Sequence, residues 1–233
     1  MRRIGSVGGL VIAACAALGG GVVGAHSALA TDVKGSVAVR SSGAASHAKP
    51  ARAAYVREWN GFLQPKEPAR NVGREVAVVL VGAMGGSRDA VALVFDQGDL
   101  SPRTLVVQAG TSVRVKNNDD FAHELHAVGN EDFKPTETIG GSGRQVQLNT
   151  AGNWPLRDRV ASHVRGHLHV LPKVSAVAQI NAKGEYVFSG VAPGKYTLKV
   201  FRGAEEASSA DIEVPDSREL KVDPISIAVK AGG

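Results

Sequence analysis

The chain has 233 residues, which is enough for one or two domains with a sizeable core. Its 27 basic and 22 acidic residues are interspersed without a basic block, so the sequence gives no sign of nucleic-acid binding. The only cysteine, Cys15, lies near the N-terminus. If that segment is removed, the protein has neither a disulfide nor a thiolate metal ligand, and its core alone must stabilise the fold.

Residues 1–30 have the features of a secretory signal peptide. Arg2 and Arg3 precede an apolar stretch rich in glycine and alanine, and a small-residue cleavage motif ends at Ala30. We therefore expect export to the periplasm or the medium, cleavage after Ala30, and no stable membrane span afterwards. Two alternatives remain open, an uncleaved membrane anchor and lipoprotein processing at Cys15.

The next segment, residues 31–53, is dominated by alanine, serine, glycine, lysine and arginine and predicts a flexible linker. Beyond it, β-branched and alternating runs predict strands, and no segment has a convincing amphipathic helix pattern. The runs are residues 75–82, 90–95, 105–126, 146–148, 162–171, 174–180, 185–188, 195–201, 210–214 and 220–229. So many short strands predict an all-β protein built from two packed sandwiches.

The stretch 105–126 carries the most information. It reads as strand, tight turn, strand, a polar corner of two asparagines and two aspartates, and a third strand. At a period of two, His123 shares a face with Phe121 and Leu125, while His126 points to the other face. A histidine grouped with core side chains is either a hydrogen-bonded core residue or a metal ligand.

Five of the seven histidines fall between positions 123 and 169. In residues 162–171 the histidines occupy the polar face of a half-buried strand, where neighbouring rings could chelate a metal or simply face solvent. Neutral imidazole binds copper and zinc well, and copper binds more strongly among divalent ions. The candidate metal ligands are His123, His163, His126, His167 and His169.

Two segments resemble known families. Residues 105–123 (LVVQAGTSVRVKNNDDFAH) resemble the first ligand region of cupredoxins, in particular exported proteins of the methylamine-utilisation type. Residues 184–200 (GEYVFSGVAPGKYTLKV) resemble the core of a carboxypeptidase-regulatory-like, or transthyretin-like, module. The resemblance implies a cupredoxin-like Greek-key sandwich over residues 54–170, followed by a small transthyretin-like β-sandwich module over residues 171–231.

Position by position, the resemblance matches His123 to the family's first copper histidine. His163 matches the histidine of the family's Cys-x-x-His-Pro-x-Met segment, whose cysteine would fall at Val160 and whose methionine has no counterpart near Arg165. A blue-copper centre depends on the thiolate bond and on a long axial ligand that tunes its potential. The resemblance therefore implies a cysteine-free histidine site that binds copper without blue-copper electron transfer, or a degenerate site with no metal.

These sequence features leave three classes of function for the protein. The first is an exported copper-binding protein with a redox or envelope partner. The second is a non-enzymatic scaffold without metal, which presents the long loop 129–143 to a protein or glycan in the cell envelope.

The third class is an enzyme, and we expect none. Asp158, Ser162 and His163 are neighbours in sequence, whereas a catalytic triad is defined by its spatial geometry. Asp119 and Asp120 are more typical of a hydrogen-bonded turn than of an acid/base pair.

Overall fold

The computed structural model describes residues 30–42, 71–82 and 91–230. Residues 1–29 of the expected signal peptide, Cys15 among them, lie outside these ranges. Among the described residues, no helix has the length and apolar character needed to cross a membrane.

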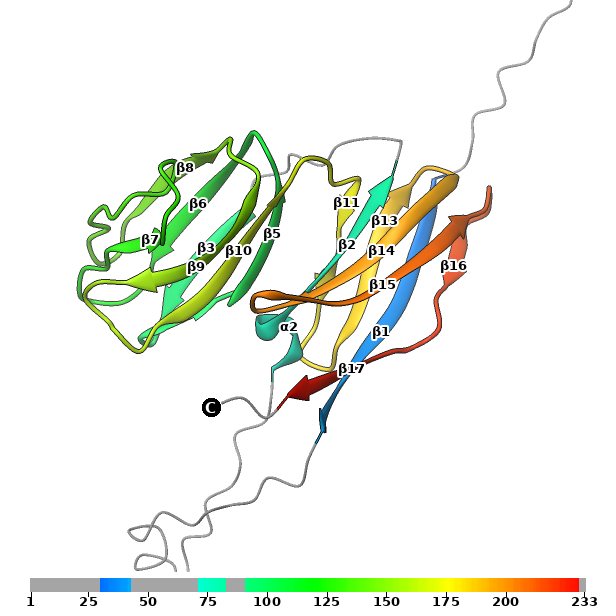
Figure 1. The fold of residues 1–233 in the computed structure, drawn as a ribbon, viewed down its shortest axis with the longest axis horizontal. Helices are drawn as coiled ribbons and strands as arrows, with labels where there is room; N and C mark the ends of the chain where they lie inside the picture. Colours follow the sequence, from blue (N-terminus) through cyan, green and yellow to red (C-terminus); the bar gives the residue numbers. More distant parts are fainter. Residues whose placement is uncertain (1–29, 43–70, 83–90, 231–233) are drawn as a thin grey trace, which may run out of the picture.

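The prediction of an all-β protein is confirmed, since the described residues form strands and one short helix (Figure 1). The first sandwich is made from β3 (Val91–Asp96), β4 (Asp99–Ser101), β5 (Thr104–Gln108), β6 (Thr111–Asn117), β7 (Leu125–Ala127), β8 (Gly143–Leu148), β9 (Gly152–Asp158) and β10 (Arg165–Leu171). Its two sheets have the orders β4-β3-β6-β8 and β5-β10-β9-β7. The pairs β3–β6 and β5–β10 are parallel, so the chain crosses between the sheets as a Greek-key sandwich requires.

The second sandwich contains β1 (Thr31–Ser42), β2 (Val76–Gly82), β11 (Ala176–Val177), β12 (Gln179–Ile180), β13 (Glu185–Val191), β14 (Gly194–Arg202), β15 (Glu205–Val214), β16 (Glu219–Lys221) and β17 (Ile225–Lys230). One sheet has the order β12-β13-β1-β16, with β17 also paired to β1, and the other has the order β11-β2-β14-β15. The short helix α2 (Val72–Glu75) directly precedes β2.

The linker prediction is wrong for residues 31–42, which form β1. This strand pairs antiparallel with β13 and parallel with β16 and β17, and it buries Val33 and Val37 in the second core. A central strand has hydrogen-bonded neighbours on both sides, so two well-placed valines suffice to anchor a segment of otherwise low hydrophobicity. The composition of residues 31–42 does not reveal that Val33 and Val37 point to the same face of a strand.

The predicted boundary between the domains also needs correction. The predicted first domain, residues 54–170, includes β2, but β2 pairs along its length with β14 of the second sandwich. The second sandwich therefore begins before the first in sequence and is completed after it. A β-branched run predicts a strand but does not specify its partner.

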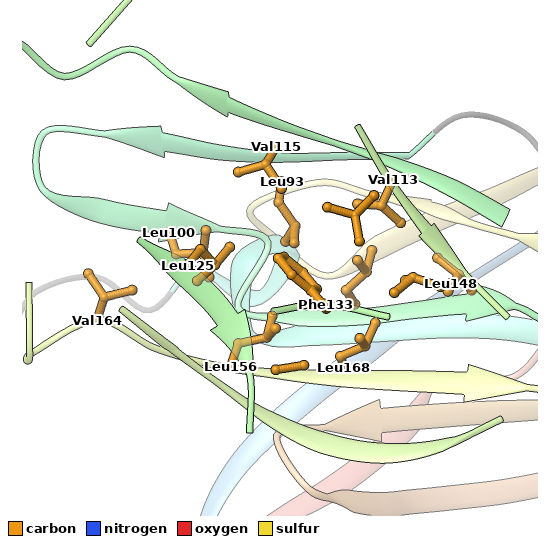
Figure 2. Close-up of a cluster of buried hydrophobic side chains, with 14 of the residues drawn as sticks. Leu93, Leu100, Val113, Val115, Leu125, Phe133, Leu148, Leu156, Val164 and Leu168 are labelled. Carbon is orange, nitrogen blue, oxygen red and sulfur yellow. The ribbon is translucent and has the colours of Figure 1, made fainter. Parts of the chain in front are cut away.

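The first core follows the alternating pattern of its strands. On β6, Val113 and Val115 are buried while Arg114 and Lys116 are exposed. Figure 2 shows the resulting cluster, with the fully buried Phe133 in its middle. Phe133 comes from the long loop 129–143, which the scaffold alternative would present to a partner; the loop is irregular as predicted, but it also contributes a central core residue.

The β14–β15 hairpin, orange in Figure 1, reaches from the second sandwich to the first. In its turn, the carbonyl of Gly203 accepts a hydrogen bond of 2.7 Å from Nε2 of His169, and its N–H donates to Oγ1 of Thr104 at 2.8 Å. Nδ2 of Asn153 donates to the carbonyl of Ala204 at 3.0 Å. An apolar cluster extends this junction and consists of Ala77, Val79, Val106, Val174 and Phe201.

Candidate functional site

His123 is fully buried at one end of the first sandwich. Its backbone forms an isolated bridge with Thr138, with hydrogen bonds of 3.0 Å and 2.8 Å in the two directions. Its ring stacks on Phe95 with a centroid distance of 3.8 Å and an interplanar angle of 8°, and the ring of Phe121 lies 4.6 Å away. The predicted inward orientation of His123 is therefore confirmed.

Both ring nitrogens of His123 face carboxylates. Nδ1 lies 2.5 Å from Oδ2 of Asp158, and Nε2 lies 3.0 Å from Oδ2 of Asp119. Both carboxylates are buried. Each ring nitrogen therefore has a carboxylate oxygen as its hydrogen-bond partner, so neither nitrogen faces open space. We call this arrangement the Asp–His–Asp bridge (Asp119, His123 and Asp158).

Backbone donors hold the two carboxylates in place. Oδ1 of Asp158 accepts hydrogen bonds from the N–H groups of Glu124, Val160 and Ala161, at 3.3, 2.7 and 3.2 Å. Oδ2 of Asp119 also accepts the N–H of Gly98 at 3.0 Å. These donors offset the negative charge of the buried carboxylates, and they fix each side chain toward the ring.

In the polar corner ahead of His123, Asn117 and Asp119 are buried, whereas Asn118 and Asp120 are exposed. The Asn117 side chain donates to the carbonyls of Phe121 and Thr138, at 2.7 and 2.9 Å. Its Oδ1 accepts the N–H of Asp119 at 2.9 Å, which is an Asx turn. The corner was predicted to be a turn, and the structure adds that this turn aims Asp119 inward at His123.

His163 lies at the same end of the sandwich and is exposed. Its Nε2 donates to the carbonyl of Gly98 at 2.8 Å. Gly98 follows Gln97 in the tight turn between β3 and β4, where both residues have positive φ, 55° and 73°. Since the N–H of Gly98 donates to Asp119, a hydrogen-bonded path through Gly98 and Asp119 connects His163 to His123.

The other three candidate ligands lie on the opposite side of their sheet. His126, His167 and His169 are on the outer face of β5-β10-β9-β7, because His126 pairs with Arg157 and His167 with Pro155 in register. The structure therefore does not bring the five histidines together. Of the two alternatives left open for His169, a solvent-facing ring does not hold, since the side chain is buried against Phe201 with ring centroids 4.6 Å apart.

Burial affects the titration of two of these rings. Burial, followed by the charges of His169 and Arg157, lowers the pKa of His167 below its usual value. Burial also lowers the pKa of His169, although its hydrogen bond to Gly203 and the charge of Glu206 act in the opposite direction. Both rings therefore favour the neutral form.

The residues at the His123 end do not fit the copper centre of the resembled family. Both nitrogens of His123 face carboxylates, and the exposed Val160 stands where the family has its thiolate. Over the part of the chain that the structure describes, no cluster of three or more histidine, cysteine or acidic side chains is arranged to hold a metal ion.

Sequence analysis missed Asp119 and Asp158 as partners of His123. Asp119 lies four residues before the histidine, and its place in the Asn-x-Asp corner was the available signal. Asp158 lies 35 residues beyond it, and its neighbours in sequence are Ser162 and His163 rather than His123. No local pattern links positions so far apart, and only the pairing of β7 with β9 brings them together.

No protein-family model matches this sequence, and a comparison with curated proteins finds no match either. Among solved structures, the chain is similar to amicyanin from Paracoccus versutus, with 15% identity, a TM-score of 0.32 and coverage of 40% of this chain and 97% of that one. An oxidised proline-to-alanine variant of amicyanin gives 16% identity, a TM-score of 0.33 and coverage of 42% and 99%. Amicyanin is a cupredoxin, the fold type predicted for this part of the chain. At this identity and TM-score the likeness carries no inference about copper, and the strand pairing itself establishes the β-sandwich architecture.

Proposed function

We propose that this chain is an exported, non-enzymatic binding protein of two β-sandwiches, in which the histidine at the cupredoxin-like ligand position is structural. The Asp–His–Asp bridge carries this proposal, with Nδ1 of His123 2.5 Å from Asp158 and Nε2 3.0 Å from Asp119. The histidine thus joins β3, the polar corner and the end of β9 in one buried network.

Metal binding needs a lone pair on an imidazole nitrogen. A nitrogen that donates its proton to a carboxylate has no lone pair to offer. Copper at Nε2 of His123 would have to displace Asp119 and leave the N–H of Gly98 without its acceptor. The cost of unpairing a buried carboxylate and a buried backbone donor works against such a site.

Copper binding through nitrogen ligands is the competing function. One observation favours it, because His123 and His163 lie at the same end of the sandwich and are linked through Gly98. If Asp119 moved aside, the two rings would provide a histidine-only site without blue-copper chemistry.

Calorimetric titration of the chain starting at Thr31 with Cu(II) separates the two functions. We expect no stoichiometric binding that depends on His123 or His163. The test variants are His163→Ala, whose side chain is exposed, and the double variant with His123→Ala. The matched control replaces His126 and His167, on the outer face of the sheet, with alanine.

One outcome would overturn the proposal. In it, the unmodified chain and the control bind one equivalent of Cu(II), whereas His163→Ala and the double variant bind none. A nitrogen-only site of that kind would give a weak d–d band without an intense thiolate charge-transfer band. Binding that is lost only in the control would identify weak surface coordination and leave the proposal standing.

A further inference from the structure

A cavity of about 350 Å³ lies between the two sandwiches, away from the Asp–His–Asp bridge. Its floor is the outer face of β9 and β10, and its far wall is the turn of the β14–β15 hairpin. Its charged and titratable lining residues are Glu75, Arg103, Arg157, Arg165, His167 and Arg202. The lining carries four guanidinium groups and one carboxylate, and Asp99 beside Arg103 offsets one more positive charge, so the cavity has a net positive charge.

Two of the four arginines lie near acidic side chains of the described residues, and two do not. Arg103 pairs with Asp99 at 2.9 Å, and Arg202 lies 3.3 Å from Glu75. Arg157 and Arg165 form no salt bridge with any residue that the structure describes, and their guanidinium groups donate only to nearby backbone carbonyls. Most of their donor capacity is therefore free for a ligand.

Arg157 and Arg165 are also direct neighbours across the β9–β10 pair. Like charges placed opposite each other on one face of a sheet destabilise it. The effect of this charge reaches the next residue on that face, since Arg157 is one of the causes that lower the pKa of His167. An anion bound between these residues would relieve the repulsion.

The wall contributed by the second sandwich has an unmet donor. Nε of Arg202 is buried without a hydrogen-bond partner, although the rest of its guanidinium reaches Glu75. A buried N–H without an acceptor costs free energy. Because this nitrogen is itself buried, the donors open to a ligand are those of the two guanidinium groups on the floor.

We propose that this cavity binds a small ligand that carries a phosphate or sulfate group. Guanidinium groups bind the oxygens of such groups through paired, charge-assisted hydrogen bonds. The volume lies within the range of small-molecule sites, and a concave recess between two domains suits one anionic group better than an extended charged surface. The inference rests on the proposed function as a binding protein and gives it a ligand class.

Calorimetric titration of the chain starting at Thr31 with inorganic pyrophosphate, sulfate and citrate at low ionic strength tests the inference. We expect saturable binding of pyrophosphate and sulfate that weakens as salt is added, because the guanidinium groups are partly exposed. Arg165→Gln, and the double variant with Arg157→Gln, should weaken binding roughly tenfold or more. Arg165 is exposed, so the single variant should fold normally.

The matched control is the double variant Arg114→Gln, Lys116→Gln. It removes the same charge from exposed positions on β6, in the other sheet, and should bind like the unmodified chain. A second readout is the imidazole of His167, followed by NMR, whose pKa should rise when pyrophosphate is bound because the anion offsets Arg157. This rise should be absent in the double variant.

Three outcomes would overturn the inference: no saturable binding, equal loss in the control, or citrate binding as tight as pyrophosphate. The last would show a general response to negative charge. Because these measurements involve no metal, their failure would leave the structural role of His123 untouched, and a positive copper titration would leave the anion site untouched.

Discussion

Nδ1 of His123 and Oδ2 of Asp158 lie 2.5 Å apart inside the first sandwich, although 35 residues separate them in the chain. This contact joins the segment before β7 to the end of β9. With Asp119 on the other nitrogen, it places the ring of His123 in a buried network of carboxylates and backbone donors. Such a network is weak support for stability as a whole, but removing one member is costly.

The first prediction concerns Asp158→Asn. The amide keeps the size of the side chain but replaces the carboxylate oxygen closest to the ring of His123, which lies 2.5 Å from Nδ1. We expect a loss of about 3 kcal/mol in the free energy of unfolding, measured by urea denaturation. The exposed Asp120→Asn serves as the control and should change stability by less than about 0.5 kcal/mol. Equal effects of the two substitutions would contradict the charge network.

The second prediction tests the core role of the segment 129–143. Phe133 is fully buried, with an exposed fraction of 0%, whereas Ile139 in the same segment is 60% exposed. Phe133→Ala should cost about 3–5 kcal/mol of unfolding free energy because it opens a cavity in the centre of the cluster. Ile139→Ala should be close to neutral. A small effect of Phe133→Ala in denaturant unfolding would mean that the segment is a detachable loop.

The third prediction concerns β1. Val37 is buried in the second core, and its neighbour Ala38 is exposed on the other face of the strand. Val37→Asp would bury an unpaired carboxylate and should cost more than about 4 kcal/mol, with loss of dispersed NMR signals from the second sandwich. Ala38→Asp should retain the native spectrum. Native spectra for both variants would show that residues 31–42 are dispensable, as the linker prediction implied.

The fourth prediction is a pH dependence at the junction of the sandwiches. Burial lowers the pKa of His169 below its usual 6.5, against the opposing charge of Glu206. The unfolded chain therefore binds more protons than the folded chain as the pH falls below about 6.5. The associated stability is present above that pH and is lost as the pH falls toward the folded pKa.

Thermal unfolding of the unmodified chain and of His169→Gln checks this dependence. Between pH 7.5 and pH 5, the unmodified chain should lose more stability than the variant, whose amide can still donate to Gly203 but does not titrate. His163→Gln is the control at an exposed position and should keep the dependence of the unmodified chain. The idea fails if His169→Gln leaves the pH dependence unchanged.

The class of fold could be read from the sequence because strand patterns are local. The alternation of Val113 and Val115 with Arg114 and Lys116 predicted which face of β6 is buried, and the structure confirms it. The grouping of His123 with Leu125, opposite His126, was equally local and is also confirmed. Both follow from the two-residue period of a strand.

The sequence by itself therefore determined that the protein is built from β-strands and that one histidine points into a core. Only the tertiary structure decided which strands share a sheet, that β1 and β2 belong to the second sandwich, and that Asp119 and Asp158 face His123. The tertiary structure also placed Arg157 next to Arg165, and it placed Arg202 in the lining of the same cavity. The physical reason is that side-chain direction is set by neighbouring residues along the chain, whereas strand partners and charge partners are set by contacts between residues far apart in sequence.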